Sequence, residues 1–250
     1  MRPLDDAPLR GGILIIGSLL WDPNGARVAW RAARLAPQGK RSVAAPVYYG
    51  RRSRSRGNTF TMTFDTSGSS GAAVVVPLAS YAAQPQDVVS DAGALWKAEH
   101  PTAAADSLGA EWGCAASLFR PGVPNAWLED WCRAFRARAP RPVSLVDDRG
   151  ILQIEWPTPT DGRDLSFDFL LATATQGECT RPTPEVVADA WVDQDQGHEK
   201  YFFENVRNGI RTADDQMIWA RMLERRPPWL ARSAYATAQQ MLASELKTGA

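Results

Sequence analysis

The chain has 250 residues, and its 28 Lys and Arg residues balance its 28 Asp and Glu residues, so the formal net charge is zero. This balance excludes a chain-wide basic field for nucleic acid or an anionic membrane surface, although a local basic patch can still occur. Hydrophobic residues make up 44% of the chain and charged residues 22%, which excludes a disordered, collagenous or coiled-coil protein and predicts a globular one.

The first half of the chain is rich in predicted strands. A β-branched run over residues 13–16 indicates a buried strand that ends at Gly17. Pro46 lies within a second apolar run and favours an edge position for that strand. A helix is predicted over residues 87–99, where apolar residues recur at helical spacing. The strands expected in this half cover residues 13–16, 43–49, 59–64, 72–78 and 118–119.

The second half mixes strands with helices. Trp127, Trp131 and Phe135 recur at helical spacing and predict an amphipathic helix over residues 125–138. From Thr183 onward the chain is predicted to be helical, with Thr183 and the proline after it forming the first helix start. The other expected elements are strands over residues 143–146, 151–156 and 166–171 and a last helix over residues 233–247.

The sequence contains no internal repeat and no linker that divides it. We therefore expect one α+β domain that spans residues 1–250. Within this domain, residues 12–120 would form a core, and residues 121–250 would form a mixed strand and helix extension packed on that core.

A glycine–serine pair follows the first predicted strand. A strand that runs into Gly17 presents successive backbone N–H groups where no Cβ crowds them. Such a loop can hold a carboxylate or a developing oxyanion, and the Ser18 hydroxyl adds one more polar group. An ordinary tight turn is the other interpretation, and spacing alone favours it because Gly-Ser pairs are common.

Glu99 lies at the end of the apolar face of the helix predicted over residues 87–99. Val88, Ala92 and Leu95 precede it on this face. A carboxyl group in that position is partly removed from water, which makes it a candidate general base. The alternative is a helix that frays at His100 and leaves Glu99 in solvent, and the pattern alone does not separate the two readings.

Four arginines lie within residues 51–56, directly before Gly57. Guanidinium groups can bind phosphate, carboxylate or RNA. A solvated loop between two strands is the favoured interpretation for most of these arginines. Nucleic-acid binding would need aromatic side chains among them, and Tyr48 and Tyr49 lie just outside the run.

The cysteines and histidines indicate no metal, disulfide or cofactor chemistry. Cys114, Cys132 and Cys179 are far apart and form no C-x-x-C pair, so neither a disulfide framework nor a zinc motif is predicted. His100 and His198 lie in no known catalytic motif. Isolated thiols are typical of a reducing compartment, and no apolar stretch approaches the about 20 residues of a membrane span, so we expect a cytoplasmic protein.

Residues 16–23 resemble the Tyr-Gly-Ser-Leu motif that opens the γ-glutamylcyclotransferase-like proteins, and the Gly-Ser-Leu-Ile-Trp-x-Pro form of the ChaC-type branch is the most similar. Residues 53–58 are similar to the Ser-x-x-x-Arg-Gly-Thr segment that this branch carries downstream. A strand over residues 72–78, followed by a helix with an acidic residue, fits the order of the family. The resemblance covers roughly residues 12–100.

This resemblance implies a fold and a site. The fold would be α+β, a small mixed β-barrel or sheet with flanking helices, and residues 121–250 would add a helical C-terminal extension. Glu99 matches the acid/base residue of the family, and Glu111 is the other acidic residue that could take this role. The residues that would bind the γ-glutamyl part of a substrate are Ile16, Gly17, Ser18, Leu19, Arg56 and Gly57.

The implied reaction requires no cofactor and no metal. The α-amine of a γ-glutamyl compound attacks its own γ-carbonyl and releases 5-oxoproline together with an amine or peptide. A carboxylate takes a proton from the attacking ammonium and returns one to the leaving amine, while backbone donors hold the charge on the carbonyl oxygen. Because the attack is intramolecular, it already has a large proximity advantage.

The sequence also departs from the family. Ile16 stands where the family has Tyr, and residues after about 120 have no counterpart that we can place, so glutathione itself is not favoured as the substrate. The C-terminal half could close the pocket or build a homodimer.

The first hypothesis is therefore a cyclotransferase-like enzyme with a small-molecule γ-glutamyl substrate. The second is a non-catalytic carboxylate or anion-binding protein, and the third is a nucleic-acid contact through residues 51–56; no membrane partner is expected.

Overall fold

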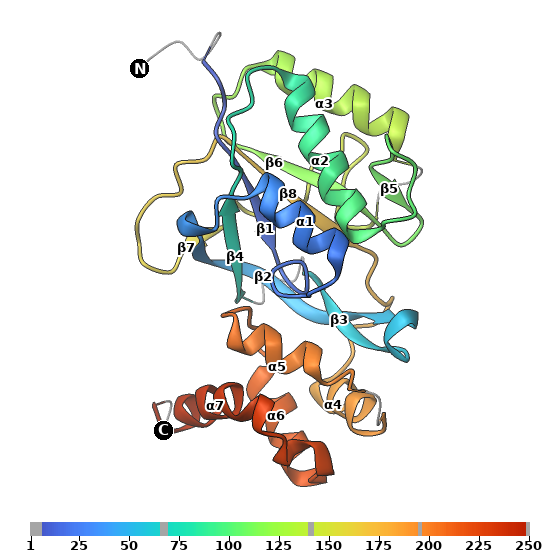
Figure 1. The fold of residues 1–250 in the computed structure, drawn as a ribbon, viewed down its shortest axis with the longest axis vertical. Coiled ribbons are helices and arrows are strands. Elements are labelled where there is room, and N and C mark those ends of the chain that lie inside the picture. The colour runs from blue at the N-terminus through green and yellow to red at the C-terminus, as the bar shows by residue number, and fades with distance from the viewer. Residues whose placement is uncertain (1–6, 66–69, 140–142, 195–196, 249–250) are drawn as a thin grey trace. The chain divides into compact units, whose positions relative to one another are not determined.

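The computed structural model describes residues 7–65, 70–139, 143–194 and 197–248 of the chain (Figure 1). The strands are β1 (Gly11–Ile15), β2 (Arg41–Ser53), β3 (Thr59–Phe64), β4 (Ser70–Pro77), β5 (Gly109–Ala110), β6 (Gly113–Phe119), β7 (Thr158–Pro159) and β8 (Phe169–Thr175). The α-helices are α1 (Gly25–Arg34), α2 (Pro85–Glu99), α3 (Asn125–Arg138), α4 (Pro184–Val192), α5 (Lys200–Arg207), α6 (Asp215–Arg225) and α7 (Ala236–Thr248).

The chain is divided into two compact units, each built from three segments. Unit 1 contains Met1–Ile15, Asp22–Ala45 and Val74–Gln176. Unit 2 contains Ile16–Trp21, Pro46–Ala73 and Gly177–Ala250. The chain passes from one unit to the other within β2 and within β4, so both units contain residues from either side of residue 120.

The strands form a mixed sheet in the order β3-β2-β4-β1-β8-β6-β5, and β7 pairs with β2. Strand β1 is antiparallel to β4 and parallel to β8, and β8 is antiparallel to β6. Within the described residues, β3 and β5 each pair with one strand, so the sheet is open and does not close into a barrel. The predicted α+β class is confirmed.

Unit 1 is built around β1, β6 and β8. These strands are buried on both faces, as Ile13, Ala115 and Leu171 illustrate. Strands covered on both faces read as continuous apolar runs, which is why the sequence signal for β1 was clear. Helix α2 packs against β6 and β8, and both α1 and α3 contact α2 (Figure 1).

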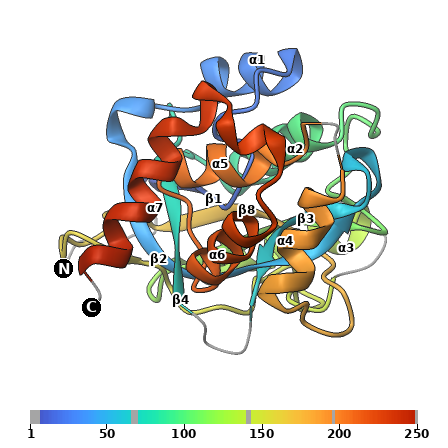
Figure 2. The same ribbon diagram turned by 90° about the horizontal axis from the view of Figure 1, so that it is seen from below.

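Unit 2 combines β3 and the second part of β2 with the four C-terminal helices (Figure 2). Phe203 of α5 lies at the centre of an aromatic cluster between these helices. Its ring stacks on Tyr235 with the centroids 4.3 Å apart, and Trp219 and Trp229 contact it edge to face. The predicted helical C-terminal extension is confirmed as a set of helices, with an apolar core of its own.

Most predicted elements are confirmed to within a few residues. The helices predicted over residues 87–99 and 125–138 are α2 and α3, and Thr183 caps α4 by accepting a hydrogen bond from the Val186 N–H. The strands predicted over 13–16, 59–64 and 72–78 are β1, β3 and β4. Strand β8 lies further along the chain than the predicted range 166–171.

The strands predicted over residues 143–146 and 151–156 are wrong. The first segment folds as a turn, in which the Val146 N–H donates to the Val143 carbonyl, and Val146 forms only an isolated bridge with Leu152. Their apolar side chains are nevertheless buried, as Leu145 and Leu152 show. An apolar run therefore indicated burial correctly here, but the secondary structure incorrectly.

The predicted edge position of the strand that contains Pro46 is also wrong, because β2 lies between β3 and β4. The register explains how the proline is accommodated. Pairing of β2 with β7 includes Val43 and Ala44, and its pairing with β3 begins at Val47. Pro46 lies between these two ladders, and although it has no N–H to donate, its carbonyl accepts a hydrogen bond of 2.8 Å from the Asp65 N–H.

Candidate functional site

The Gly17–Ser18 segment forms a tight turn directly after β1 and belongs to unit 2. Two backbone hydrogen bonds define it: the Leu20 N–H donates to the Gly17 carbonyl at 3.1 Å, and the Trp21 N–H donates to the Ser18 carbonyl at 3.2 Å. Ser18 is 9% exposed. The turn therefore presents a short, ordered stretch of main chain with one hydroxyl group.

Ile16 and Leu19 flank this turn with buried side chains. Their exposed fractions are 9% and 4%. Such apolar side chains anchor the turn in the interior. Any contact of these two residues with a ligand would therefore come from their main-chain groups.

Tyr201 of α5 covers the turn at Gly17. A Cβ atom placed on Gly17 would lie 2.3 Å from the Tyr201 hydroxyl oxygen, so only glycine allows this approach. The same hydroxyl accepts a hydrogen bond of 3.2 Å from the Met62 N–H on β3. Tyr201 thus connects the turn, the edge strand and α5 within unit 2.

Arg56 reaches the same turn from the arginine-rich segment. Its guanidinium Nη2 donates to the Ser18 Oγ at 3.3 Å, and its Cζ lies 5.0 Å from the centre of the Tyr201 ring. A cation over an aromatic face is held by the ring quadrupole. The structure therefore brings Ser18, Arg56 and Tyr201 into contact beside Gly17.

Gly57 follows Arg56 and has the left-handed φ of +61° that favours glycine. A Cβ at this position would lie 2.8 Å from the Gln194 Oε1, 3.1 Å from the His198 Cδ2 and 3.2 Å from the His198 Nε2. The edge of the His198 imidazole thus lies against the main chain beside Arg56. Sequence analysis had given His198 no role, and no sequence signal connects it with residue 57.

Two buried polar atoms lie beneath this part of unit 2. Asn205 of α5 accepts a hydrogen bond of 2.8 Å from the Trp21 Nε1 through its Oδ1, and its Nδ2 is buried. The Tyr49 hydroxyl is also buried, and burial raises its pKa well above the ordinary tyrosine value while the neighbouring Asn205 side chain opposes this effect. Asn205 and Tyr201 lie one helical turn apart, which is the one sequence signal that could have placed both at a common site.

Glu99 belongs to unit 1, where it is the last residue of α2. The helix does not fray before this residue, and the predicted apolar face is buried. The Glu99 side chain is 17% exposed, and its Oε2 accepts a hydrogen bond of 2.6 Å from the Arg27 Nη2. Arg27 also bonds Asp22 at 2.7 Å, so one guanidinium joins these two carboxylates.

The sequence had no signal for Arg27, which precedes Glu99 by 72 residues. A guanidinium bonded to a carboxylate fixes its orientation, which a general base requires. The same ion pair also stabilises the fold, so its presence does not require a catalytic role for Glu99. That Glu99 faces the Gly17–Ser18 turn remains a prediction.

Two aromatic residues lie close to Glu99 in the chain, Trp96 and His100. Trp96, His100 and Trp112 form a cluster whose ring centroids lie 4.8–5.9 Å apart. Glu111, the other acidic candidate, is exposed in the connection between β5 and β6. Of the two acidic candidates, Glu99 is therefore the one whose side chain is mostly removed from water.

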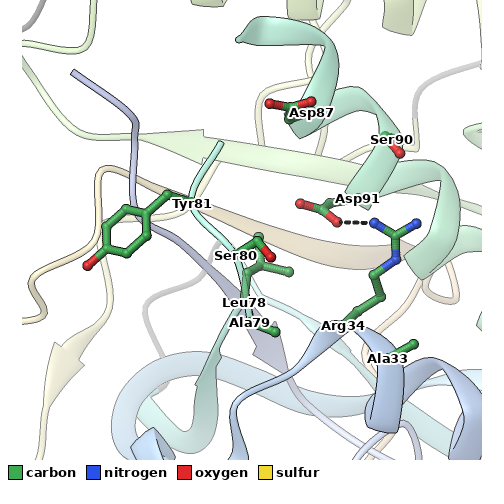
Figure 3. A pocket seen from close by; sticks show the side chains of 9 residues that line it. All are labelled: Ala33, Arg34, Leu78, Ala79, Ser80, Tyr81, Asp87, Ser90 and Asp91. Atoms are coloured by element: carbon green, nitrogen blue, oxygen red, sulfur yellow. Dashed lines mark hydrogen bonds and ion pairs between the residues drawn. The ribbon is translucent and has the colours of Figure 1, made fainter. Parts of the chain in front are cut away.

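A surface cavity of about 300 Å³ lies in unit 1 beside α2 (Figure 3). Arg34 and Asp91 form an ion pair at its wall with Nη1 and Oδ1 3.0 Å apart, and the Tyr81 ring points away from this pair. Burial raises the pKa of Asp91, while Arg34 opposes this effect. None of the residues predicted from the sequence lines the cavity, and its Asp91 carboxylate is already paired with Arg34.

Within the described residues, no group of three His, Cys, Asp or Glu side chains is placed to hold a metal ion. No helix in the part of the chain that the structure describes has both the length and the apolar composition to cross a bilayer. Comparisons of the chain with protein-family models, with curated proteins and with solved structures gave no match.

Proposed function

We propose that this protein binds a small carboxylate-bearing molecule, with the Gly17–Ser18 turn and Arg56 as its recognition element. The observation that carries the proposal is the 3.3 Å contact between the Arg56 guanidinium and the Ser18 hydroxyl. This hydrogen bond to a neutral group is longer than the about 2.7–2.9 Å typical of a guanidinium bonded to a carboxylate. A carboxylate accepts a shorter and stronger hydrogen bond from a guanidinium than a hydroxyl group does.

Three further features support this choice of ligand. The guanidinium fork matches the two oxygens of a carboxylate better than a point charge does. The Tyr201 ring beneath Arg56 limits the directions in which the guanidinium can turn. The Ser18 hydroxyl can donate to a second ligand oxygen, which would give the site more than one contact.

Isothermal titration calorimetry with L-glutamate tests the proposal. Arg56→Gln should weaken binding at least tenfold, since a hydrogen bond to a charged group contributes about 1.5–3 kcal/mol. Arg54→Gln is the matched control, because Arg54 is an exposed arginine of the same segment. Absence of binding by the wild-type protein, or equal binding by the Arg56→Gln variant, would refute the proposed site.

The second candidate function is a γ-glutamylcyclotransferase-like activity, and the partly buried Glu99 favours it. A new C–N bond would form between the substrate's α-nitrogen and its γ-carbonyl carbon, and the bond from that carbon to the leaving nitrogen would break. Glu99 would take a proton from the α-ammonium group and deliver it to the leaving amine. The products are 5-oxoproline and an amine or peptide, with no oxidant or cofactor consumed.

This activity is tested by incubating the protein with a panel of γ-glutamyl dipeptides and glutathione and measuring 5-oxoproline. Glu99→Gln should abolish its release, whereas Glu111→Gln should not. Loss of activity in the Glu111→Gln variant alone would transfer the acid/base role to Glu111. If no compound in the panel yields 5-oxoproline while L-glutamate binds, the carboxylate-binding function remains and the enzymatic one does not.

A cytoplasmic location and a homodimeric state complete the proposal. The cysteines are free, with Cys114 and Cys132 buried and Cys179 exposed, which suits a reducing compartment. Light scattering of the purified protein tests the dimer. A nucleic-acid contact has less support, because the Arg52 guanidinium lies over the Phe60 ring and already donates to the Asn58 carbonyl.

A further inference from the structure

We infer that His198 is a second ligand-binding residue of the proposed carboxylate site. This inference rests on the proposed function and adds a residue from the C-terminal segment to it. The starting observation is the close approach of the His198 imidazole to Gly57, with the Nε2 only 3.2 Å from the position that a Cβ would occupy. Because residue 57 is glycine, the ring can reach the main chain directly after Arg56.

His198 and Tyr201 come from one turn of the chain, and each lies against a glycine of the proposed site. The Tyr201 N–H donates to the His198 carbonyl at 3.0 Å, so these residues are successive projections from one turn at the start of α5. Tyr201 contacts Gly17, whereas His198 contacts Gly57. Arg56 lies over the Tyr201 ring and next to Gly57 in the chain. The imidazole, the guanidinium and the Ser18 hydroxyl therefore belong to one region of unit 2.

The chemistry of this group suits an oxyanion. An imidazole ring can donate a hydrogen bond in its neutral form and adds a positive charge when protonated. Arg56 supplies a permanent positive charge and up to five donors. The Gln194 amide group, whose Oε1 also lies against Gly57, provides a neutral polar wall. A carboxylate that bonds Arg56 can therefore place an oxygen or a neighbouring polar group within reach of His198.

Calorimetry on the full-length chain tests the role of His198, with L-glutamate and inorganic phosphate as the two probes. His198→Gln should weaken L-glutamate binding at least fivefold. The matched control is His100→Gln, because His100 is the other of the two histidines and lies in unit 1. This control should bind L-glutamate as the wild-type protein does. Urea unfolding of both variants verifies that they fold.

The outcomes separate this inference from the proposed function. Wild-type affinity in the His198→Gln variant, together with loss of binding in Arg56→Gln, would overturn the inference and leave the proposed function standing. Absence of binding by the wild-type protein would overturn both. Tighter binding of phosphate than of L-glutamate, weakened by His198→Gln, would support His198 as an oxyanion ligand but overturn the carboxylate assignment.

The NMR signals of the imidazole rings distinguish direct ligand contact from a purely structural role of His198, because only direct contact should shift the His198 signal when L-glutamate binds. The two histidines give separate ring signals, which the two Gln variants assign. L-glutamate should shift the His198 ring signal in the wild-type protein and leave the His100 signal in place. An unchanged His198 signal at saturating L-glutamate would contradict direct contact.

Discussion

Substitution of Gly17 by Ala measures how tightly the turn is closed by Tyr201. The added Cβ would lie 2.3 Å from the Tyr201 hydroxyl oxygen, about 1 Å too close for a normal contact. The φ of Gly17 is not positive, so alanine brings no conformational strain of its own. The cost is therefore steric, and overpacking of this kind destabilises by about 1–3 kcal/mol.

The Tyr201→Phe substitution should relieve this clash. With the hydroxyl removed, the nearest ring atom to the new Cβ is the Cζ at 3.3 Å, which needs only a few tenths of an ångström of adjustment. Alone, Tyr201→Phe leaves the Met62 N–H without this partner, at a cost of about 1–3 kcal/mol. In the Phe background, Gly17→Ala should cost less than about 1 kcal/mol, because alanine also lowers the entropy of the unfolded chain.

Urea unfolding followed by tryptophan fluorescence gives the four free energies of this double-mutant cycle. The two substitutions should be non-additive, with a coupling energy of about 1–2 kcal/mol that makes the double variant more stable than the sum predicts. Gly25→Ala is the control, since a Cβ there meets nothing within 4 Å. Additive effects at positions 17 and 201 would refute the contact between Gly17 and the tyrosine hydroxyl.

Three further predictions concern charge and thiol chemistry. Glu99→Gln should destabilise the protein by about 1–2 kcal/mol in urea unfolding, because its ion pair is mostly buried; an unchanged midpoint would contradict this. Burial raises the pKa of the Cys114 thiol to about 11, so in the native protein the exposed Cys179 should react fastest with an aromatic disulfide reagent, and Cys179→Ser should remove that fast phase. Hydrogen bonds from Arg221 lower the pKa of Asp189, so its contribution is present at pH 7 and is lost as the pH falls through the native pKa; Asp189→Asn should cost about 0.5–1 kcal/mol at pH 7 and progressively less as the pH falls below about 4, and a cost that grew with acidification would be against this reasoning.

The sequence predicted the elements that carry a clear period or an unbroken apolar run. Helices α2 and α3 have apolar residues at helical spacing, and β1 and β3 are short apolar strands, so local patterns were sufficient for them. The same reasoning failed for residues 143–156, where apolar side chains are buried without a strand ladder. Burial can be read from composition there, but hydrogen bonding between strands depends on partners elsewhere in the chain.

The candidate site shows the same division. The glycine–serine pair after a strand made Gly17 and Ser18 candidates, whereas only the family resemblance singled out Arg56 among the four neighbouring arginines. The contacts of these residues with Tyr201 and His198, and the ion pair of Glu99 with Arg27, join segments that are far apart in the chain. Such contacts depend on how helices and strands pack, and a period of two or 3.6 residues carries no information about them. Composition and pattern thus determined the class of fold and the identity of the polar groups, whereas tertiary packing decided which of those groups meet.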